Sequence, residues 1–270
     1  MREQNWAVVI PYFNEEDCLE QCMSCLLHQT KRPSQIILVN NASTDRSPLL
    51  TREFKERFGH LFEIVLIDEP KPGKIHALVT GTALVRTDYF ATWDADTYYP
   101  PDYLTKAHTG YQGRKGSCVA AVMATNIKGP LSSFKSLFRI FKIQTLATLF
   151  SSECHAGGYA ETFRTALFRK VGGFDPVRWP YVLEDHEIVE CLLKVGRVRY
   201  PVGFWCLTSP RRADRCRVTW TKTDKILYRY TPFFMKKWFF YTYLWSRFEQ
   251  KGLFFHRLRE QPWKTNKKSS

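Results

Sequence analysis

Two carboxylates stand one residue apart at the end of an apolar run, in the segment YFATWDADTYYPPD that begins at Tyr89. Asp94 and Asp96 would repel each other there, and taking each of them out of water is costly unless a positive group lies between them. One interpretation is a solvated strand end that carries acids by chance. The other is a divalent cation, which binds one or two carboxylates and leaves its other positions to phosphate oxygens and water. The second interpretation predicts a metal site for a phosphorylated ligand.

The elements that position these acids can be read from the alternation of strand and helix patterns. Apolar, β-branched runs that end in turn residues predict strands, and apolar residues at three- and four-residue spacing predict helices. The expected strands are residues 6–13, 35–41, 62–69, 89–94 and 118–127, and the expected helices are 15–29, 47–58, 75–85 and 101–112.

This order predicts an α/β fold with a mostly parallel central sheet and helices on both faces. Ligands bind such sheets at the carboxyl ends of the strands. Three polar clusters fall at expected strand ends, and they read YFNEE, NNASTD and DAD. We therefore expect these clusters to converge in space, with Ser43 to Asp45 also capping the helix that follows.

Charge is distributed unevenly along the 270 residues, whose formal net charge is +14. Residues 211–270 hold 16 Lys and Arg against four acids, so the excess belongs to the C-terminal part. Such a segment suggests an anionic partner, which can be a membrane surface, a phosphorylated ligand or a nucleic acid. Acids come too early for a signal peptide, and uncharged runs are too short to cross a bilayer, so we expect a soluble, cytosolic chain.

Eight cysteines are present, and without a secretory signal they are expected to be free thiols. The spacing of Cys18, Cys22 and Cys25 matches the three-cysteine iron–sulfur loop of radical SAM enzymes. The same spacing lies on one face of a helix, where free cysteine packs as a small hydrophobe. A core helix is the preferred interpretation, because the surrounding residues also follow an amphipathic pattern.

Five motifs together carry a resemblance that none carries alone. They are VVIPYFNEEDCLEQCMSCLLHQ, IILVNNASTDRS, PGKIHALVTG, DAD, and GGFD followed by LEDHE. In this order they resemble the family 2 glycosyltransferases, which have the GT-A fold, over roughly residues 6–200. The resemblance implies a nucleotide-sugar donor, Mn2+ or Mg2+, and transfer with inversion at the anomeric carbon.

The resemblance also implies roles at matching positions. Asp96 is expected to hold the metal, with Asp94 facing the ribose or sugar beside Ala95, and Asp185 is expected to act as the general base. The adjacent Glu184 would orient the acceptor or cap the helix, although EDHE is also read as a plain acidic first turn. The remaining expected donor-site residues are Pro11, Tyr12, Asn14, Glu15, Asn40, Ser43, Asp45 and Lys74.

Two departures from the family pattern concern the nucleotide and the number of sugars added. Asn40 stands where an aspartate usually reads the nucleotide base, and its amide can still donate and accept, so a uridine nucleotide is only moderately favoured. The Gln-x-x-Arg-Trp motif of processive members is absent, which predicts one sugar per encounter. In its approximate place Arg211, Arg212 and Arg215 either clamp the diphosphate or form a basic surface loop.

The acceptor side is expected in residues 155–220. Gly157 and Gly158 would allow close approach of a sugar to the backbone. His186, next to the expected base, is either a tuning group or purely structural, and Trp220 is a candidate for acceptor contact. His155 is a weaker candidate as a metal or phosphate ligand, because a lone histidine is more often structural.

The expected organisation is a catalytic domain at 1–210, with a nucleotide half at about 1–100 and an acceptor half at about 101–210, followed by an extension at 211–270. Residues 227–255 of the extension interleave aromatic rings with Lys and Arg, which is typical of a segment at a membrane interface. The alternative is a helix whose rings pack on the catalytic domain. Membrane binding would place the protein on the inner face of the cell membrane and favour a lipid-linked or cell-envelope glycan acceptor.

Three rival functions were weighed against glycosyl transfer. A nucleotidyltransferase would show a glycine-rich phosphate loop near the first strand, and PYFNEEDC has none. A nucleic-acid-binding protein would explain the basic tail but not the acidic motifs, so no nucleic acid is expected as a partner. A catalytically degenerate GT-A binding module stays open.

Overall fold

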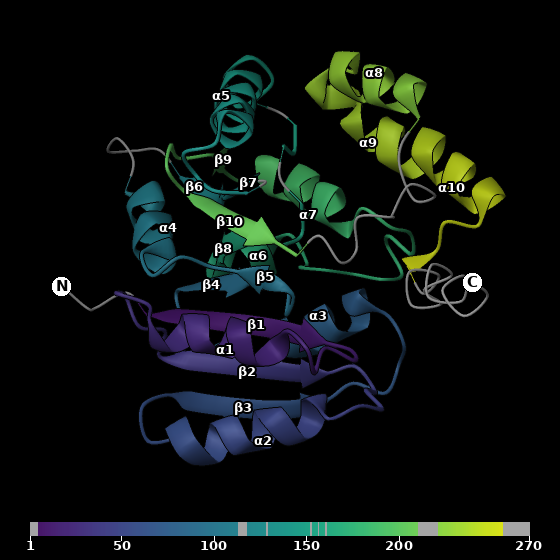
Figure 1. Ribbon diagram of the computed structural model, residues 1–270. Coiled ribbons are helices and arrows are strands. Elements are labelled where there is room, and N and C mark those ends of the chain that lie inside the picture. Colours follow the sequence, from purple (N-terminus) through teal and green to yellow (C-terminus); the bar gives the residue numbers. More distant parts are fainter. Residues whose placement is uncertain are drawn as a thin grey trace, which may run out of the picture.

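A seven-stranded sheet forms the centre of the computed structural model, in the order β3-β2-β1-β4-β8-β6-β9 (Figure 1). The structure describes residues 5–112, 118–127, 129–151, 153–155, 157–159, 161–209 and 221–255. The strands of this sheet are β1 (Trp6–Tyr12), β2 (Gln35–Asn40), β3 (Glu63–Asp68), β4 (Tyr89–Thr92), β6 (Val119–Met123), β8 (Glu161–Arg164) and β9 (Arg197–Arg199).

The sheet is mostly parallel, as expected. β1 pairs in parallel with β2 and β4, β2 with β3, and β6 with β9. β8 runs antiparallel to both of its neighbours, β4 and β6. The four-residue β8, which was not among the expected strands, thus separates β4 from β6.

A second, three-stranded sheet begins directly after the acidic loop that follows β4. It consists of β5 (Thr97–Tyr98), β10 (Trp205–Thr208) and β7 (Thr125–Ile127), in that order. The expected single strand at 118–127 is therefore divided, with β6 in the large sheet and β7 in the small one.

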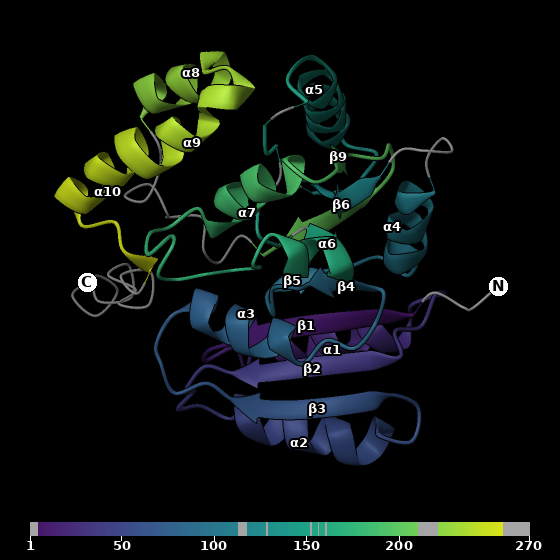
Figure 2. The same ribbon diagram turned by 180° about the vertical axis from the view of Figure 1, so that it is seen from behind.

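Helices cover both faces of the large sheet (Figures 1 and 2) because its strands are apolar on both faces. In β1, Val8 and Ile10 point into one core, and Ala7 and Val9 point into the other. The first core is closed by α1 (Leu19–Leu27), α2 (Ser47–Phe58) and α4 (Tyr103–Tyr111), and the second by α3 (Lys74–Ala83), α6 (Thr165–Lys170) and α7 (Glu184–Leu193), with part of α5 (Phe134–Leu149).

The cysteine-containing segment is a core helix, as preferred. α1 buries Cys22 and Cys25 among its apolar residues, and Cys18 precedes its first turn. The helix begins at Leu19, later than the expected Glu15, because residues 15–18 form a turn that bonds to the segment before α2. The cysteines of the described residues are free thiols.

Residues 221–255, the described part of the C-terminal extension, are mostly helical and share a core with the rest of the chain. Phe239, Phe240, Leu244 and Phe248 pack around Trp179 in a third cluster of buried residues. The interpretation of these rings as core therefore holds for this part of the aromatic segment. The helical elements in the described part of the extension are α8 (Lys222–Tyr230), the 3-10 turn η2 (Phe233–Met235), α9 (Lys236–Trp238), the π-helical η3 (Phe239–Leu244) and α10 (Trp245–Lys251).

Candidate active site

Asp94 and Asp96 lie in the loop between β4 and β5, at the carboxyl edge of the large sheet. The Nζ of Lys74, the first residue of α3, donates to Oδ1 of Asp94 at 2.5 Å and to the carbonyl of Gly158 at 3.4 Å. The loop is also fixed from behind, because the Tyr99 hydroxyl accepts from the Asp94 N–H at 2.8 Å. An ammonium group thus supplies the positive charge beside the first carboxylate.

Lys74 reaches this position because the loop before α3 is tied to the end of β2. The side chain of Asn41 accepts from the Gly73 N–H at 2.9 Å and donates to the carbonyls of Glu69 and Lys71 at 3.0 and 2.7 Å. Gly73 has φ of 126°, which L side chains rarely adopt. Asn41 was not among the expected site residues, and its only signal was its place at the end of a strand.

Gly158 connects the acidic loop to the acids of α7. Its carbonyl accepts from Lys74, and its N–H donates to Oδ2 of Asp185 at 3.0 Å. The N–H of His186 donates to Oδ1 of the same carboxylate at 2.9 Å. Residues that are 91 positions apart, Asp94 and Asp185, are therefore linked through one lysine and one glycine.

The carboxylates around this link are poorly solvated. Asp185 and Glu184 are partly accessible to solvent, yet surrounding protein atoms desolvate them, and this raises the pKa of both side chains. The two backbone N–H donors oppose part of the rise for Asp185. A carboxyl group with a raised pKa is closer to the range useful for taking a proton from a hydroxyl.

A third carboxyl group, Glu161 on β8, was not expected from the sequence. It is 1% exposed, and its Oε1 has no hydrogen-bond partner among the described residues. Burial, followed by the nearby charge of Asp185, raises its pKa well above the ordinary value. Burial thus favours the neutral form of this carboxyl group relative to an exposed glutamate.

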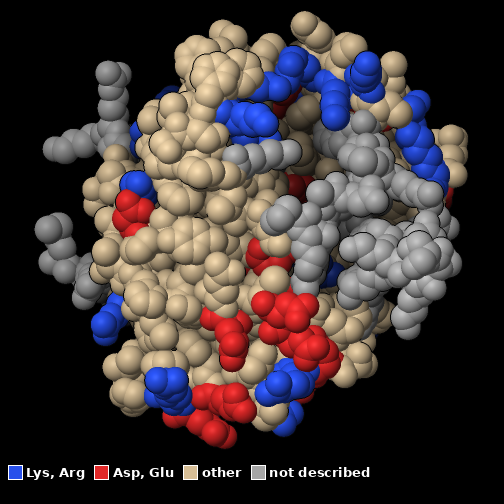
Figure 3. Space-filling view, in the orientation of Figure 1, with Lys and Arg blue, Asp and Glu red and all other residues tan. Residues whose placement is uncertain are grey.

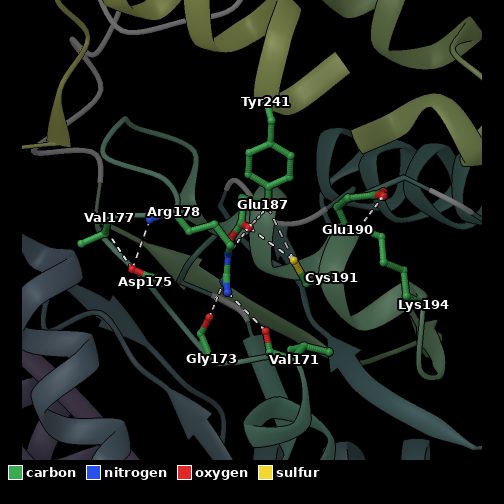
Figure 4. Close-up of polar contacts among 10 residues, drawn as sticks. All are labelled: Val171, Gly173, Asp175, Val177, Arg178, Glu187, Glu190, Cys191, Lys194 and Tyr241. Carbon is green, nitrogen blue, oxygen red and sulfur yellow. Dashed lines mark hydrogen bonds and ion pairs between the residues drawn. The ribbon is translucent and has the colours of Figure 1, made fainter. Parts of the chain in front are cut away.

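The helix that carries Glu184 and Asp185 is clamped by Arg178 (Figure 4). The Arg178 guanidinium donates to both oxygens of the buried Glu187, at 2.7 and 3.2 Å, and to the carbonyls of Val171 and Gly173. The hydroxyl of Tyr241, in the extension, donates to the same carboxylate. A bidentate pair of this kind fixes orientation as well as position, so the first turn of α7 is held rigidly.

The polar clusters after β1 and β2 contact each other, as expected. Asn14, with φ of 52°, donates from its N–H to the Ser43 hydroxyl at 3.1 Å and accepts from the Thr44 N–H at 2.8 Å. Asp45 accepts from the Glu16 N–H at 3.1 Å and from the Ser47 N–H at 3.0 Å at the start of α2. Thus the carboxyl ends of the two strands form one hydrogen-bonded surface.

Several expected donor-site side chains are already occupied by protein partners. The Asn40 amide donates to Asp68 at 2.8 Å and accepts from the Ser43 N–H at 2.9 Å. Tyr12 is buried, and its hydroxyl bonds to Thr51 at 3.1 Å. Pro11, Glu15 and Ala95 are also buried at this edge. The exposed carboxylate of Asp68, which the sequence argument did not single out, lies at the same strand ends.

Asp96 provides the second carboxylate of the loop and is partly buried. Its carbonyl accepts from the Ser209 N–H at 3.0 Å, which joins the loop to β10. Carboxylate oxygens are suitable ligands for Mg2+ or Mn2+, which need only one or two of them when a diphosphate supplies the rest. Two carboxylates in one loop therefore fit a cation that a ligand also coordinates. Among the residues that the structure describes, no group of three potential metal ligands occurs.

The remaining expected residues are a glycine, two histidines and a set that lies outside the described residues. Gly157 lies against the ring of Tyr159, where a Cβ would approach to 2.5 Å. His186 is desolvated, which lowers its pKa to about 4 and keeps it neutral, and its ring lies 5.8 Å from that of Tyr228. His155 bonds to the backbone at Phe150 and to Tyr200, which is a structural arrangement. Arg211, Arg212, Arg215 and Trp220 lie outside the described residues.

On one face of the molecule, acidic groups extend from the lower part to the middle (Figure 3). Asp and Glu gather over the right-hand ends of β1 and β2, and further acids appear in the hollow above them. Lys and Arg gather over the helices at the top of the same view. This arrangement suits a ligand that brings cations or donors to the acids and anionic groups to the rim.

Residues 7–172 match the family model described as Glycosyl transferase family 2. The chain belongs to this family. It is 28% identical over 222 residues to the Escherichia coli K12 protein named uncharacterized glycosyltransferase YaiP, a match that covers 79% of this chain and 54% of that protein. It is 30% identical over 103 residues to the undecaprenyl-phosphate 4-deoxy-4-formamido-L-arabinose transferase of Edwardsiella ictaluri, covering 37% of this chain and 31% of the relative.

Solved structures of glycosyl-transferring or nucleotide-sugar-binding proteins share the fold. The mannosyltransferase PcManGT from Pyrobaculum calidifontis, in complex with GDP-Man and Mn2+, superposes with a TM-score of 0.63 at 23% identity, over 77% of this chain and 58% of that one. S. aureus TarS 1–349 in complex with UDP-GlcNAc has a TM-score of 0.59 at 15% identity, over 91% and 73%. The GT-A fold expected from the sequence is therefore confirmed. The chain spans about half the length of YaiP and less than a third of the length of the Edwardsiella ictaluri transferase.

No helix within the described part of the chain has both the length and the apolarity needed to cross a membrane.

Proposed function

We propose that this glycosyltransferase-family chain transfers one sugar at a time from a nucleotide-sugar to an acceptor hydroxyl, with inversion, and that Asp185 is the general base. The observation that carries the proposal is the link from Asp94 through Lys74 and Gly158 to Asp185. This link joins the donor-side acids to a carboxylate of raised pKa through the backbone of one glycine. An inverting transfer needs a base close to the donor site, because the base activates the acceptor hydroxyl that attacks the sugar opposite the leaving group.

The residues of the chain divide the reaction between them. Asp185 takes the proton of the acceptor hydroxyl. At the same time the hydroxyl oxygen bonds to the anomeric carbon, and the bond between that carbon and the diphosphate breaks. The N–H groups of Gly158 and His186 keep the carboxylate oriented throughout. Lys74 exchanges its hydrogen bond with Asp94 for one with the departing diphosphate, since an ammonium group binds either anion.

Asp96, with Asp94, would hold the divalent cation between the loop and the diphosphate. The cation, when bound, acts as a Lewis acid on the departing phosphate oxygens. Support for Mn2+ comes from the PcManGT complex. Asn14, Ser43 and Asp45 line the strand ends where the nucleoside would lie, and the guanidinium groups of residues 211, 212 and 215 remain candidates for the diphosphate.

The acceptor is proposed to be lipid-linked or a cell-envelope glycan. Support comes from the relative whose name specifies an undecaprenyl-phosphate acceptor. Gly157, Gly158 and His186 would face this acceptor, with Trp220 as a further candidate. We also propose a peripheral position on the inner face of the cell membrane, with 1–210 as the catalytic domain and 211–270 as its extension. A UDP-sugar is favoured as donor, and GDP-Man is the main alternative.

A thermal-shift screen of UDP, GDP, dTDP and CDP, each with and without Mn2+, tests the donor site. A nucleotide that binds the folded state raises the melting temperature by mass action. We expect one nucleotide to stabilise the protein only with Mn2+, and Asp96→Ala to remove the effect. If no nucleotide shifts the melting temperature, the binding-module function replaces catalysis as the better account.

A further inference from the structure

Helix α5 carries its apolar side chains toward solvent. Phe134 is 81% exposed and Phe141 is 69% exposed, while Leu137 and Phe138 are 53% and 58% exposed. The spacing of these residues is i, i+3, i+4 and i+7, which places them on a single face of a helix. Thr145, Thr148 and the 69% exposed Leu149 continue the same face to the end of α5.

The opposite face of α5 is the one that packs on the protein. Ser136 is buried, Ile143 and Ala147 pack against the second core, and the Gln144 amide donates to the Tyr200 carbonyl at 2.7 Å. A surface helix ordinarily buries its apolar stripe and exposes its polar one. In α5 the exposed stripe is the more apolar, so fold stability does not explain it.

A second apolar surface lies on the extension, in residues 226–238. Tyr230 is 73% exposed and Phe234 is 83% exposed, and Ile226, Phe233 and Trp238 are between 42% and 59% exposed. Tyr228 within this range and the rings from Phe239 onward belong to the third core, so exposed and buried apolar side chains adjoin each other in the extension.

The two apolar surfaces adjoin each other. The guanidinium of Arg229 in α8 lies 4.9 Å from the ring of Phe150, the residue that ends α5, and 3.7 Å from Glu153. The Tyr228 hydroxyl accepts from the Cys154 N–H at 2.9 Å. Figures 1 and 2 both show α5 and α8 together at the end of the molecule opposite α2. We call the exposed side chains of α5 and residues 226–238 the apolar platform.

Only basic charges are exposed on the platform. Residues 103–152 contain no Asp or Glu, and α5 itself carries Lys135, Arg139 and Lys142. Within residues 222–238 the single acid is Asp224, which is fully buried and bonds to Thr221, Tyr243 and Arg247. Lys222, Lys225 and Lys237 are exposed beside the aromatic rings.

We infer that the apolar platform docks this protein on an anionic lipid surface, with α5 as a principal contact. Phe and Leu side chains would enter the boundary between headgroups and acyl chains, while Lys and Arg would bind lipid phosphates. The inference goes beyond the C-terminal extension as the membrane-binding segment, because it assigns half of the surface to the catalytic part. It does not depend on any step of the transfer reaction.

The charges favour lipid over a second copy of the chain. A symmetric dimer through the platform would bring two sets of Lys and Arg together with no exposed acid on either side to pair with them. Dispersed cations around protruding rings match a fluid anionic surface, which offers phosphates at any position.

Flotation of the intact protein with two kinds of vesicle tests this inference. One kind is phosphatidylcholine alone, and the other contains phosphatidylglycerol as well. The test variant is Phe134→Ala/Phe138→Ala/Phe141→Ala, whose three side chains are exposed, so its circular dichroism should equal that of the parent protein. The matched control is Leu49→Ala/Leu61→Ala, which removes exposed apolar side chains from the other end of the molecule.

We expect the parent protein and the control to float with the anionic vesicles and the triple variant to bind at least about tenfold more weakly. Lys135→Gln/Lys142→Gln should weaken binding by about fivefold per charge and reduce its salt dependence. Equal binding of the parent and the triple variant would overturn the assignment of α5. So would a parent protein that does not float but forms a dimer, in sedimentation velocity, that the triple variant dissociates.

Discussion

At the scale of single residues, the proposed chemistry depends on how Asp185 is kept reachable and poorly solvated at once. Its two backbone donors come from Gly158 and from the first turn of its own helix, where Leu183 has φ of 71°. Leu183, in the left-handed conformation, turns the chain sharply just before α7. Glu184 and Asp185 therefore face the loop that carries Asp94. The position of the carboxylate is therefore set by backbone geometry more than by side-chain partners.

Replacement of Asp185 by Asn should abolish turnover and preserve donor binding. The amide keeps the shape of the carboxylate but cannot take a proton, so kcat should fall by about 10²- to 10⁴-fold. Nucleotide affinity, measured by the thermal shift above, should be unchanged, whereas Asp96→Ala should lose it. Near-normal turnover of Asp185→Asn would show that another group is the base.

The pH dependence of kcat/KM should also report Asp185. Because desolvation raises its pKa above the usual aspartate value of 3.8, the acid limb of the profile should lie above that value. Activity is lost as pH falls through the raised pKa, since the protonated acid cannot serve as a base. A limb near 3.8 would contradict the desolvated environment.

Residues differ in how far the sequence could predict them. Asp94, Asp96 and Asp185 belong to short motifs in a family order, so the resemblance located them. Asn41 lies within the motif IILVNNASTDRS but had no expected role, and Glu161 belongs to none of the motifs. Asn41 acts through the loop that it bonds, and Glu161 acts through its place in β8 between β4 and β6. Their environments come from long-range pairing, which local residue patterns do not encode.

At the scale of elements, the loop before α3 determines where Lys74 lies. Gly73→Ala would place a Cβ at 2.5 Å from the Phe255 ring and in a strained φ of 126°. We expect it to lower the free energy of unfolding by about 1–3 kcal/mol and to weaken nucleotide binding. Denaturant unfolding and the thermal-shift screen measure the two effects. Gly129→Ala is the control, because Gly129 also has positive φ but nothing within 4 Å. If both variants behave alike, the contact with Phe255 has no influence.

Helix α7 contains a pH-dependent weakness at Glu190. The side chain is 2% exposed, its partner Lys194 lies at 3.5 Å, and burial raises its pKa to about 7 from the usual 4.5. A raised pKa means that the contribution of this group to stability is complete below about 4.5 and is lost as pH rises through about 7. Glu190→Gln should therefore stabilise the protein by up to about 3 kcal/mol above pH 7 and have little effect at pH 4.5. Chemical denaturation at both pH values, with the exposed Glu56→Gln as control, measures this. A stabilisation that is equal at both values would exclude ionisation as its cause.

Elements were predicted well where one strand or helix is stable by its own pattern and poorly where pairing decides. The apolar runs of β1 to β4 predicted those strands closely, and the amphipathic pattern of α1 predicted the helix but not its start at Leu19. β8 reads ETFR, which has no apolar run, and its antiparallel place depends on two neighbouring strands. The division of residues 118–127 likewise depends on β10, far along the chain, which pairs with β7.

At the scale of the whole molecule, we expect the extension and the catalytic part to behave as one folding unit, because they share a core. Trp179 and Tyr181 precede α7, and their rings pack with Phe240 and Phe248 of the extension. The buried Lys236 donates to the Tyr228 carbonyl and lies 3.9 Å from Glu153, which follows α5. Aromatic density predicted that residues 227–255 have an apolar partner, but not that the same segment divides between a protein core and an exposed platform.

Phe240→Ala tests this unity, with Phe234→Ala as its matched control. Phe240 is fully buried and Phe234 is 83% exposed, six positions earlier in the same extension. Loss of the buried ring should lower the free energy of unfolding by about 3–5 kcal/mol, whereas loss of the exposed ring should change it by less than about 0.5 kcal/mol. Because the cluster includes the residues that lead into α7, calorimetry should show a single transition that moves as a whole in Phe240→Ala. Two transitions, of which only one moves, would mean that the extension unfolds separately, and the rigid support of Asp185 would then have to come from the Arg178 clamp alone.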